Sequence, residues 1–100
     1  MSQSKESSQE IGVYLHRLRK ERKLTLKEVS IQLGIDVSTL SKIENGDRQL
    51  QNHMIKPIAE LFNLKYRELQ IQFLNQKIMQ EFGDEPFLNE ALQILATTNK

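Results

Sequence analysis

Helix start and stop signals between Thr25 and Asp36 constrain the fold of this chain more than any other feature of its sequence. Thr25 and Glu28 have the spacing of a capping box, in which the hydroxyl and the carboxylate each accept a hydrogen bond from an unpaired backbone amide at a helix start. Gly34 stands where a helix can end in the left-handed conformation, which glycine adopts at the least cost. Asp36 can cap a second helix two residues later. These signals predict two short helices joined by a tight turn.

Apolar residues at helical spacing support this helix pair. Val29 and Leu33 fall on one face of the first helix. Leu40 and Ile43 do the same on the second. Two helices joined by about four residues, with a glycine in the turn, form a helix-turn-helix, whose second helix can enter the major groove of DNA. The stretch from Thr25 to Arg48 therefore predicts an element that is able to read duplex DNA.

The same stretch, with the segment that follows it, resembles the Xre/Cro-like helix-turn-helix repressors. The matching residues lie at fixed spacing within residues 11–69: Leu24-Thr25, Glu28-Val29, Leu33-Gly34-Ile35-Asp36, Ser38-Thr39-Leu40-Ser41, Ile43-Glu44-Asn45-Gly46, Arg48 and Ile58-Ala59-Glu60-Leu61-Phe62-Asn63-Leu64. The resemblance implies an all-α protein with a five-helix repressor-type domain that binds double-stranded DNA. It fits small stand-alone members of the family, which include phage repressors, restriction–modification controllers and antitoxin-type regulators, and it does not separate them.

The resemblance assigns base recognition to the second helix of the pair. With Leu40 and Ile43 turned inward, the helical repeat turns four other side chains outward, at positions that meet base edges in the family. They are Val37, Ser38, Ser41 and Lys42. A lysine can donate to guanine O6 and N7 and a valine can pack on a thymine methyl group, whereas serine discriminates poorly between bases. The alternative is that the small side chains are ordinary surface residues.

The resemblance also implies phosphate contacts around the recognition helix. The residues assigned to them are Arg19, Arg22, Lys27, Asp36, Thr39, Asn45 and Arg48. Arg19 and Arg22 lie near the end of the helix that precedes Thr25. For these two residues, the alternative is a solvated helix end whose cations interact favourably with the helix dipole. The family commonly has a glutamine where this chain has Leu26, so Lys27 and backbone amides are expected to replace it. Glu44 is expected to be buried or half-buried and to accept hydrogen bonds, and the candidate donor is an arginine of the helix that precedes Thr25.

Further capping and breaking residues predict the remaining helices. Ser7 and Glu10 have the spacing of a second capping box, which starts the first helix. Pro57 lacks an amide for the fourth helix, so this helix is expected to be kinked or to start late. Gly83 is expected to end the fifth helix, and Pro86 to stand in the first turn of the sixth. The second to fifth helices are expected over about residues 26–33, 37–44, 52–62 and 66–82.

The last two helices are predicted to form a hairpin with more apolar side chains than a five-helix domain can cover. Tyr66, Leu69 and Phe73 are expected to pack on that domain. A further set is expected to form a dimer interface: Ile71, Leu74, Ile78, Phe82, Phe87, Leu88, Leu92 and Leu95. Burying one large apolar side chain contributes about 1.5–3 kcal/mol. The alternatives are a monomer whose tail caps itself and a groove for another protein.

These expectations divide the chain into a disordered tail (residues 1–8), a helix-turn-helix DNA-binding domain (9–68), a C-terminal helical dimerisation extension (69–96) and a frayed tail (97–100). The predicted function is sequence-specific regulation of transcription by a homodimeric repressor on a pseudo-palindromic operator, because a two-fold protein reads two half-sites one duplex turn apart. The rival prediction is a protein-interaction module that keeps the helix-turn-helix fold without binding DNA.

Charge and composition narrow the function classes. Residues 11–48 hold eight Lys or Arg against five Asp or Glu, and residues 69–100 hold two against four. This asymmetry fits a DNA-binding head with a tail that avoids DNA, although ordinary scatter of surface charge explains it almost as well. Cysteine is absent, and His16 and His53 are expected to be isolated surface residues, so no metal, cofactor or catalytic residue is predicted. Without an 18-residue apolar run, the expectation is a cytoplasmic protein with no membrane contact. No domain for a small-molecule ligand is evident in the sequence, so no such ligand is expected.

Overall fold

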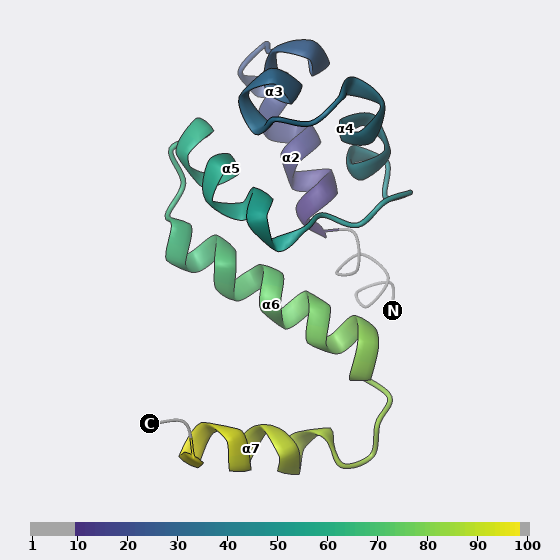
Figure 1. Ribbon diagram of the computed structural model, residues 1–100, viewed down its shortest axis with the longest axis vertical. Helices are drawn as coiled ribbons and strands as arrows, with labels where there is room; N and C mark the ends of the chain where they lie inside the picture. The colour runs from purple at the N-terminus through teal and green to yellow at the C-terminus, as the bar shows by residue number, and fades with distance from the viewer. Residues whose placement is uncertain (1–9, 99–100) are drawn as a thin grey trace.

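The computed structural model describes residues 10–98, and within that range the chain forms six α-helices and one 3-10 turn but no strand (Figure 1). The helices are α2 (Glu10–Glu21), α3 (Leu26–Leu33), α4 (Val37–Glu44), α5 (Ile55–Leu61), α6 (Tyr66–Phe82) and α7 (Leu88–Thr98). In Figure 1, α2 runs through a head that also contains α3, α4 and α5, α6 crosses below this head, and α7 lies beyond α6. The predicted all-α fold is confirmed. The capping box of Ser7 and Glu10 and the tail over residues 1–8 lie outside the described residues.

The caps expected around α3 and α4 are present. The Thr25 hydroxyl accepts a hydrogen bond from the Glu28 amide at 3.0 Å, and the Thr25 amide donates to the Glu28 carboxylate at 2.8 Å. Gly34 ends α3 in the left-handed conformation, with φ of 71°. The Asp36 carboxylate accepts from the Thr39 amide at 2.8 Å at the start of α4. Both helices have the predicted bounds, because these caps satisfy backbone groups that have no partner inside the helix.

One apolar core holds α2 to α5 and the first half of α6 together. Its buried members are Ile11, Leu15, Leu18, Val29, Leu33, Leu40, Ile43, Leu50, Met54, Ile55, Ile58, Ala59, Phe62, Leu69 and Phe73. Leu40 and Ile43 are almost completely buried. Since both belong to α4, the core fixes which face this short helix turns to solvent.

Pro57 delays the start of the fifth helix, as predicted. A 3-10 turn over Asn52–Met54 precedes α5, which begins only at Ile55. Pro57 is therefore the third residue of α5, where a backbone amide has no partner within the helix in any case. The late start is confirmed, and the proline lies where its missing amide is harmless.

α6 has the predicted bounds, but one of its expected core contacts is wrong. Leu69 and Phe73 are buried against the head, whereas Tyr66 is exposed and does not join the core. Tyr66 is the first residue of the helix, and a tyrosine tolerates such a site because its hydroxyl stays hydrated. Gly83 follows the last residue of α6 in a right-handed conformation, with φ of −60°. The helix therefore ends without a left-handed glycine cap.

α7 starts later than the sequence suggested. Pro86 is not in its first turn but stands second in a four-residue turn, in which the Leu88 amide donates to the Glu85 carbonyl at 3.3 Å. Proline favours this turn position because its φ is already set. α7 then continues to Thr98, past the expected start of a frayed tail. No residue of α7, all of which the structure describes, is buried. None of the helices within residues 10–98 has both the length and the apolarity to cross a membrane.

Candidate nucleic-acid interface

α4 presents to solvent the four side chains that the sequence assigned to base contacts. They are Val37, Ser38, Ser41 and Lys42. Ser41 is half-buried and the other three are exposed. The four positions share one face of the helix, opposite the buried Leu40 and Ile43. α4 lies at the edge of the head, to the right in Figure 1. The structure thus brings these side chains together, and their contact with bases stays a prediction.

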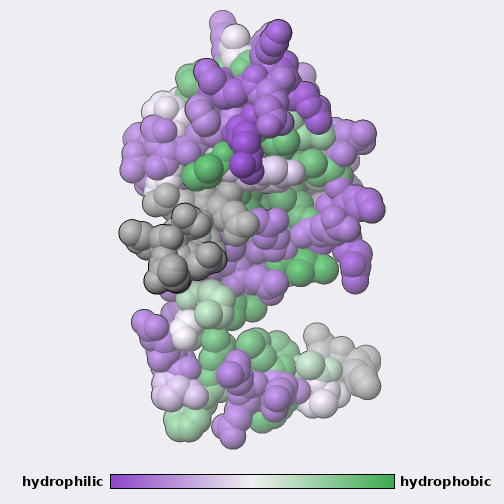
Figure 2. Space-filling view, turned by 180° about the vertical axis from the view of Figure 1, so that it is seen from behind, coloured by the Kyte–Doolittle hydropathy of each residue, from purple (hydrophilic) through white to green (hydrophobic). Residues whose placement is uncertain are grey.

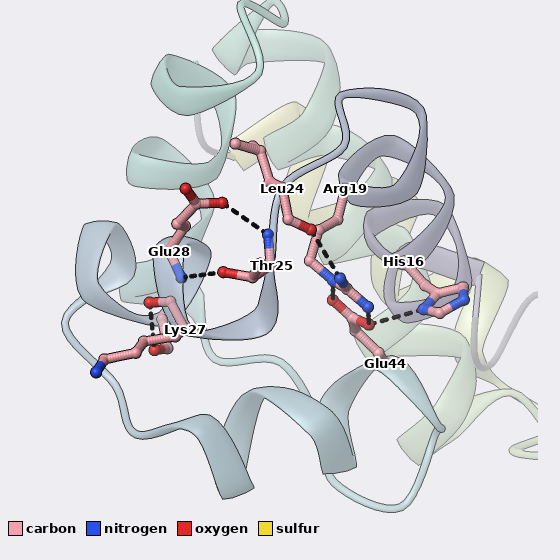
Figure 3. Close-up of polar contacts among 8 residues, drawn as sticks. His16, Arg19, Leu24, Thr25, Lys27, Glu28 and Glu44 are labelled. Carbon is pink, nitrogen blue, oxygen red and sulfur yellow. Dashed lines mark hydrogen bonds and ion pairs between the residues drawn. The ribbon is translucent and has the colours of Figure 1, made fainter.

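A buried ion pair ties the C-terminal end of α4 to α2 (Figure 3). Arg19 donates through Nε and Nη2 to the two carboxylate oxygens of Glu44, at 2.8 and 3.0 Å, and through Nη1 to the Leu24 carbonyl at 2.9 Å. The Nδ1 atom of His16 lies 2.7 Å from Oε1 of Glu44. Burial by itself raises the pKa of Glu44, but hydrogen bonds and charges from Arg19 and His16 outweigh burial and hold that pKa below its ordinary value. The prediction of Glu44 as a buried partner of an arginine is confirmed.

The same ion pair corrects two expectations. Arg19 is only 8% exposed, and Nε, Nη1 and Nη2 all donate within the protein, so it is not available to a phosphate. Its assignment to a phosphate contact is replaced by a structural role, because its charge is compensated by Glu44. His16 does lie at the surface, but the expectation that it is isolated is wrong, since it bonds Glu44.

Arg22, the other candidate in this region, is partly engaged. Its Nη2 donates to the Phe62 carbonyl at 3.0 Å, and its guanidinium carbon lies 5.6 Å from the centroid of the Phe62 ring. A guanidinium over an aromatic ring is attracted by the electrons of the ring face. The residue as a whole is exposed, so its other donors remain accessible. Its phosphate contact therefore stays a prediction.

Asp36, Thr39 and Arg48 line one open hollow beside the start of α4. Hydrogen bonds from Thr39 lower the pKa of Asp36, and the charge of Arg48 acts in the same direction. An ionised carboxylate that already caps a helix repels a phosphate. Asp36 is therefore a helix cap, and its assignment to a phosphate contact is corrected. Arg48 is exposed and supplies positive charge to this hollow.

The loop after α4 folds back on the helix that it leaves. The amides of Asp47 and Arg48 both donate to the Lys42 carbonyl, at 2.8 and 3.2 Å. Gly46 makes the bend possible with a left-handed φ of 84°. The remaining phosphate candidates outside the hollow, Lys27 and Asn45, are exposed. The loop thus holds Arg48 near the exposed face of α4.

α6 supports the segment that follows this loop. Lys77 Nζ donates to Gln49 Oε1 at 2.8 Å, and Gln70 Nε2 donates to Asn52 Oδ1 at 2.6 Å. These two contacts lie almost two helical turns apart on α6. The helix that leads into the C-terminal hairpin is therefore bonded to the chain segment next to Arg48.

Gly12 is a structural determinant of the site that the sequence interpretation missed. A Cβ atom at this position would lie 2.4 Å from the Ile43 carbonyl oxygen, closer than non-bonded atoms approach. The absence of a side chain thus lets α2 pack directly on the backbone of α4. The available signal was a glycine inside an amphipathic helix, beside the buried Ile11, since such a glycine usually has a packing reason.

We expect acid to weaken the link between α2 and α4. Because the pKa of Glu44 is depressed in the folded protein, the folded state binds this proton less readily than the unfolded state. The stabilisation from Glu44 is therefore complete above the unfolded pKa, about 4.3, and is lost as pH falls from there through the folded value. Urea unfolding from pH 7 to pH 3 measures the loss. A variant with Arg19→Met and Glu44→Leu should lose less stability over this range, and an equal loss would contradict the assignment.

The comparisons with known proteins agree with this geometry. A family model described as helix-turn-helix matches residues 15–69. The chain is 39% identical over 59 residues to the HTH-type transcriptional regulator RghRB of Bacillus subtilis (strain 168), covering 58% of this chain and 42% of that protein. It is 37% identical over 59 residues to the HTH-type transcriptional repressor RghR of the same organism, covering 58% and 44%. The chain thus spans less than half the length of these relatives, and no solved structure shows a significant match. Because the family model covers more than half of the sequence, this chain belongs to the Xre-like helix-turn-helix family.

Proposed function

We propose that this chain is a DNA-binding transcriptional regulator whose α4 enters the major groove. The observation that carries the proposal is the outward face of α4, on a helix whose opposite face is buried in the core. The Arg19–Glu44 ion pair and the close approach at Gly12 hold this helix rigidly on α2. Rigid support matters because base readout requires donors to be placed to within a fraction of an ångström.

The exposed face of α4 offers two kinds of base contact. Lys42 can donate to guanine O6 and N7, and Val37 can pack on a thymine methyl group. Ser38 and Ser41 can donate or accept and add little discrimination. Phosphate contacts are proposed for Arg22, Lys27, Thr39, Asn45 and Arg48. This arrangement separates base contacts on α4 from phosphate contacts around it, which is the usual division in protein–DNA interfaces.

We further propose that the working form is a homodimer that represses transcription from a pseudo-palindromic operator. Two copies related by a two-fold axis can place two α4 helices about 34 Å apart, one turn of duplex. Binding there would exclude polymerase from an overlapping promoter. A similar protein carries the name of a transcriptional repressor, which supports this direction of regulation.

Selection of binding sites from random duplex DNA, followed by a salt series on the selected sites, tests the proposal. We expect enrichment of an inverted repeat, with affinity that falls steeply as salt rises because phosphate contacts release counterions. Enrichment of no sequence by the folded protein would overturn the proposal. It would favour the rival function, a protein-interaction module, for which Leu26 in place of the usual glutamine is the supporting feature.

One lysine substitution and one arginine substitution distinguish the proposed base contacts from the proposed phosphate contacts. Lys42→Ala should weaken the selected site by about 1–3 kcal/mol and relax specificity at one base pair in each half-site. Arg48→Ala should instead weaken all sequences similarly and reduce the salt slope by about 1. Both effects are measured by fluorescence anisotropy on matched and mutated duplexes.

The matched control for these variants is Lys65→Ala. Lys65 is exposed in the connection between α5 and α6, which lies on the opposite side of the head from α4 (Figure 1). It should bind the selected site like the parent. If Lys42→Ala and Arg48→Ala also bound like the parent, α4 and its loop would not be the interface.

A further inference from the structure

An apolar surface on α6, α7 and the turn between them has no cover within the described chain. Its large side chains, 37–70% exposed, are Ile71, Leu74, Met79, Phe82, Phe87, Leu92, Ile94 and Leu95. We call this surface the arm face. It contributes to the green surface at the lower end of the molecule in Figure 2. Exposed apolar patches of several hundred Å² mark interaction sites, because monomeric proteins seldom leave so much apolar area in water.

α7 shows most clearly that the arm face needs a partner. The helix has 11 residues, and none of them is buried although all are described. An isolated helix shorter than about 12–15 residues is marginal in water, and most helix stability comes from packing an amphipathic face. Leu69 and Phe73 anchor α6 in the core, but no equivalent anchor on α7 reaches it. Something outside the described single chain must supply the missing contacts.

We propose that a second copy of this chain covers much of the arm face by exchange, so that α7 of each copy packs along the outer stripe of α6 of the other. The proposal rests on the homodimer of the proposed function and names its interface. The outer stripe of α6 consists of Ile71, Leu74, Ile78 and Phe82, and the facing stripe of α7 of Leu88, Ala91, Leu92 and Leu95. Each stripe repeats at three- and four-residue steps, the spacing that lets two helices pack side by side. A two-fold axis forms both α6–α7 contacts at once.

Charge around the arm face selects a protein occupant. The acidic residues between residues 69 and 98 are Glu81, Asp84, Glu85 and Glu90. Lys77 is the only lysine or arginine between residues 69 and 98, and its ammonium group donates to Gln49. Nucleic acid and anionic lipid are therefore repelled from this surface. An apolar surface of the same kind on a second copy meets no such repulsion along the two stripes.

The exposed area agrees with the size of a dimer interface. The chain exposes 7384 Å². A compact monomer of 11.7 kDa exposes only about 5900 Å² according to the general scaling of surface with mass. The difference exceeds the roughly 800 Å² that each partner buries in a stable protein–protein interface, and the exposed side chains of the arm face contribute to it.

The first test measures the mass of the chain without DNA, by size exclusion with light scattering. We expect twice 11.7 kDa for the parent. The double variant Leu92→Glu, Leu95→Glu should have the mass of one chain, because it places two carboxylates in the interface. The matched control Gln93→Glu, Thr97→Glu adds the same two charges outside the apolar stripe of α7 and should remain a dimer. If the charged variant loses more helical circular dichroism than unfolding of α7 alone would explain, Leu92→Ala with Leu95→Ala replaces it.

The second test distinguishes exchange from a dimer that pairs α6 with α6 and α7 with α7. Leu74→Lys and Leu92→Glu should each be monomeric alone, and their mixture should form dimers. In an exchanged mixed dimer one α6–α7 contact is unmodified and the other pairs lysine with glutamate. In the like-with-like arrangement every contact would keep one unpaired charge, so the mixture would stay monomeric.

Three outcomes would overturn the exchange: a monomeric parent, a dimeric Leu92→Glu, Leu95→Glu variant, or a mixture of the two single variants that stays monomeric. None of these measurements involves DNA. A failure here therefore leaves the assignment of α4 to the major groove intact, and failure of site selection leaves the dimer intact.

Discussion

Glu44→Ala should lower the free energy of unfolding by about 3–5 kcal/mol, the usual effect of removing one partner from a buried ion pair. The variant leaves the Arg19 guanidinium charged at a site that is only 8% exposed, without the carboxylate that now binds its Nε and Nη2. Small domains are stable by about 5–15 kcal/mol in total, so a large share of the stability is at stake. Urea unfolding at pH 7, followed by circular dichroism, measures the change.

Removing both charges is the matched control for this prediction. Arg19→Met with Glu44→Leu should regain most of the lost stability, since replacing a whole buried pair by apolar side chains is often neutral or stabilising. Glu28→Ala removes an exposed carboxylate from the capping box and should cost only about 1 kcal/mol. If Glu44→Ala lost no more stability than Glu28→Ala, the Arg19 guanidinium would have to become hydrated when its partner is removed.

Gly12→Ala should also destabilise the protein, although alanine is the better helix former by about 1 kcal/mol. The added Cβ atom would lie 2.4 Å from the Ile43 carbonyl oxygen, and a backbone atom cannot move aside as the tip of a side chain can. Overpacking of a tight contact costs about 1–3 kcal/mol, which outweighs the gain in helix propensity. Relief of the contact requires α2 and α4 to move apart. We therefore expect weaker binding to the selected DNA site as well as a lower urea midpoint.

Val13→Ala is the control for the helix-propensity part of this argument. Val13 is the next residue of α2 and is half exposed, so its replacement by alanine adds no atom and removes no core contact. It should change the stability by a few tenths of a kcal/mol at most. If Gly12→Ala were stabilising, the close approach of α2 to the α4 backbone would be looser than the structure indicates.

The parts of the fold that the sequence predicted are those set by local signals. Thr25, Gly34 and Asp36 define the ends of α3 and the start of α4, because each acts on backbone groups within three or four residues of itself. Pro57 shifts the start of α5 for the same kind of reason. Such signals need no knowledge of the rest of the chain.

The corrections at Arg19, His16 and Gly12 concern contacts between residues far apart in sequence. Arg19 looked like one more cation in a basic helix end, and only the position of Glu44, 25 residues later, turns it into a buried structural residue. His16 looked isolated because its partner is 28 residues away. The importance of Gly12 likewise depends on where the α4 backbone lies. Spacing along one helix cannot reveal which of several arginines faces a distant carboxylate.

The uninterrupted course of α6 has a consequence for the operator. α6 has 17 residues, about 25 Å of helix, and it joins the segment beside Arg48 to the surface proposed to hold the second copy. One inserted residue would turn everything beyond it by about 100° and advance it by about 1.5 Å. In the proposed dimer, the number of residues in α6 therefore sets the spacing between the two half-sites, although this helix need not touch DNA.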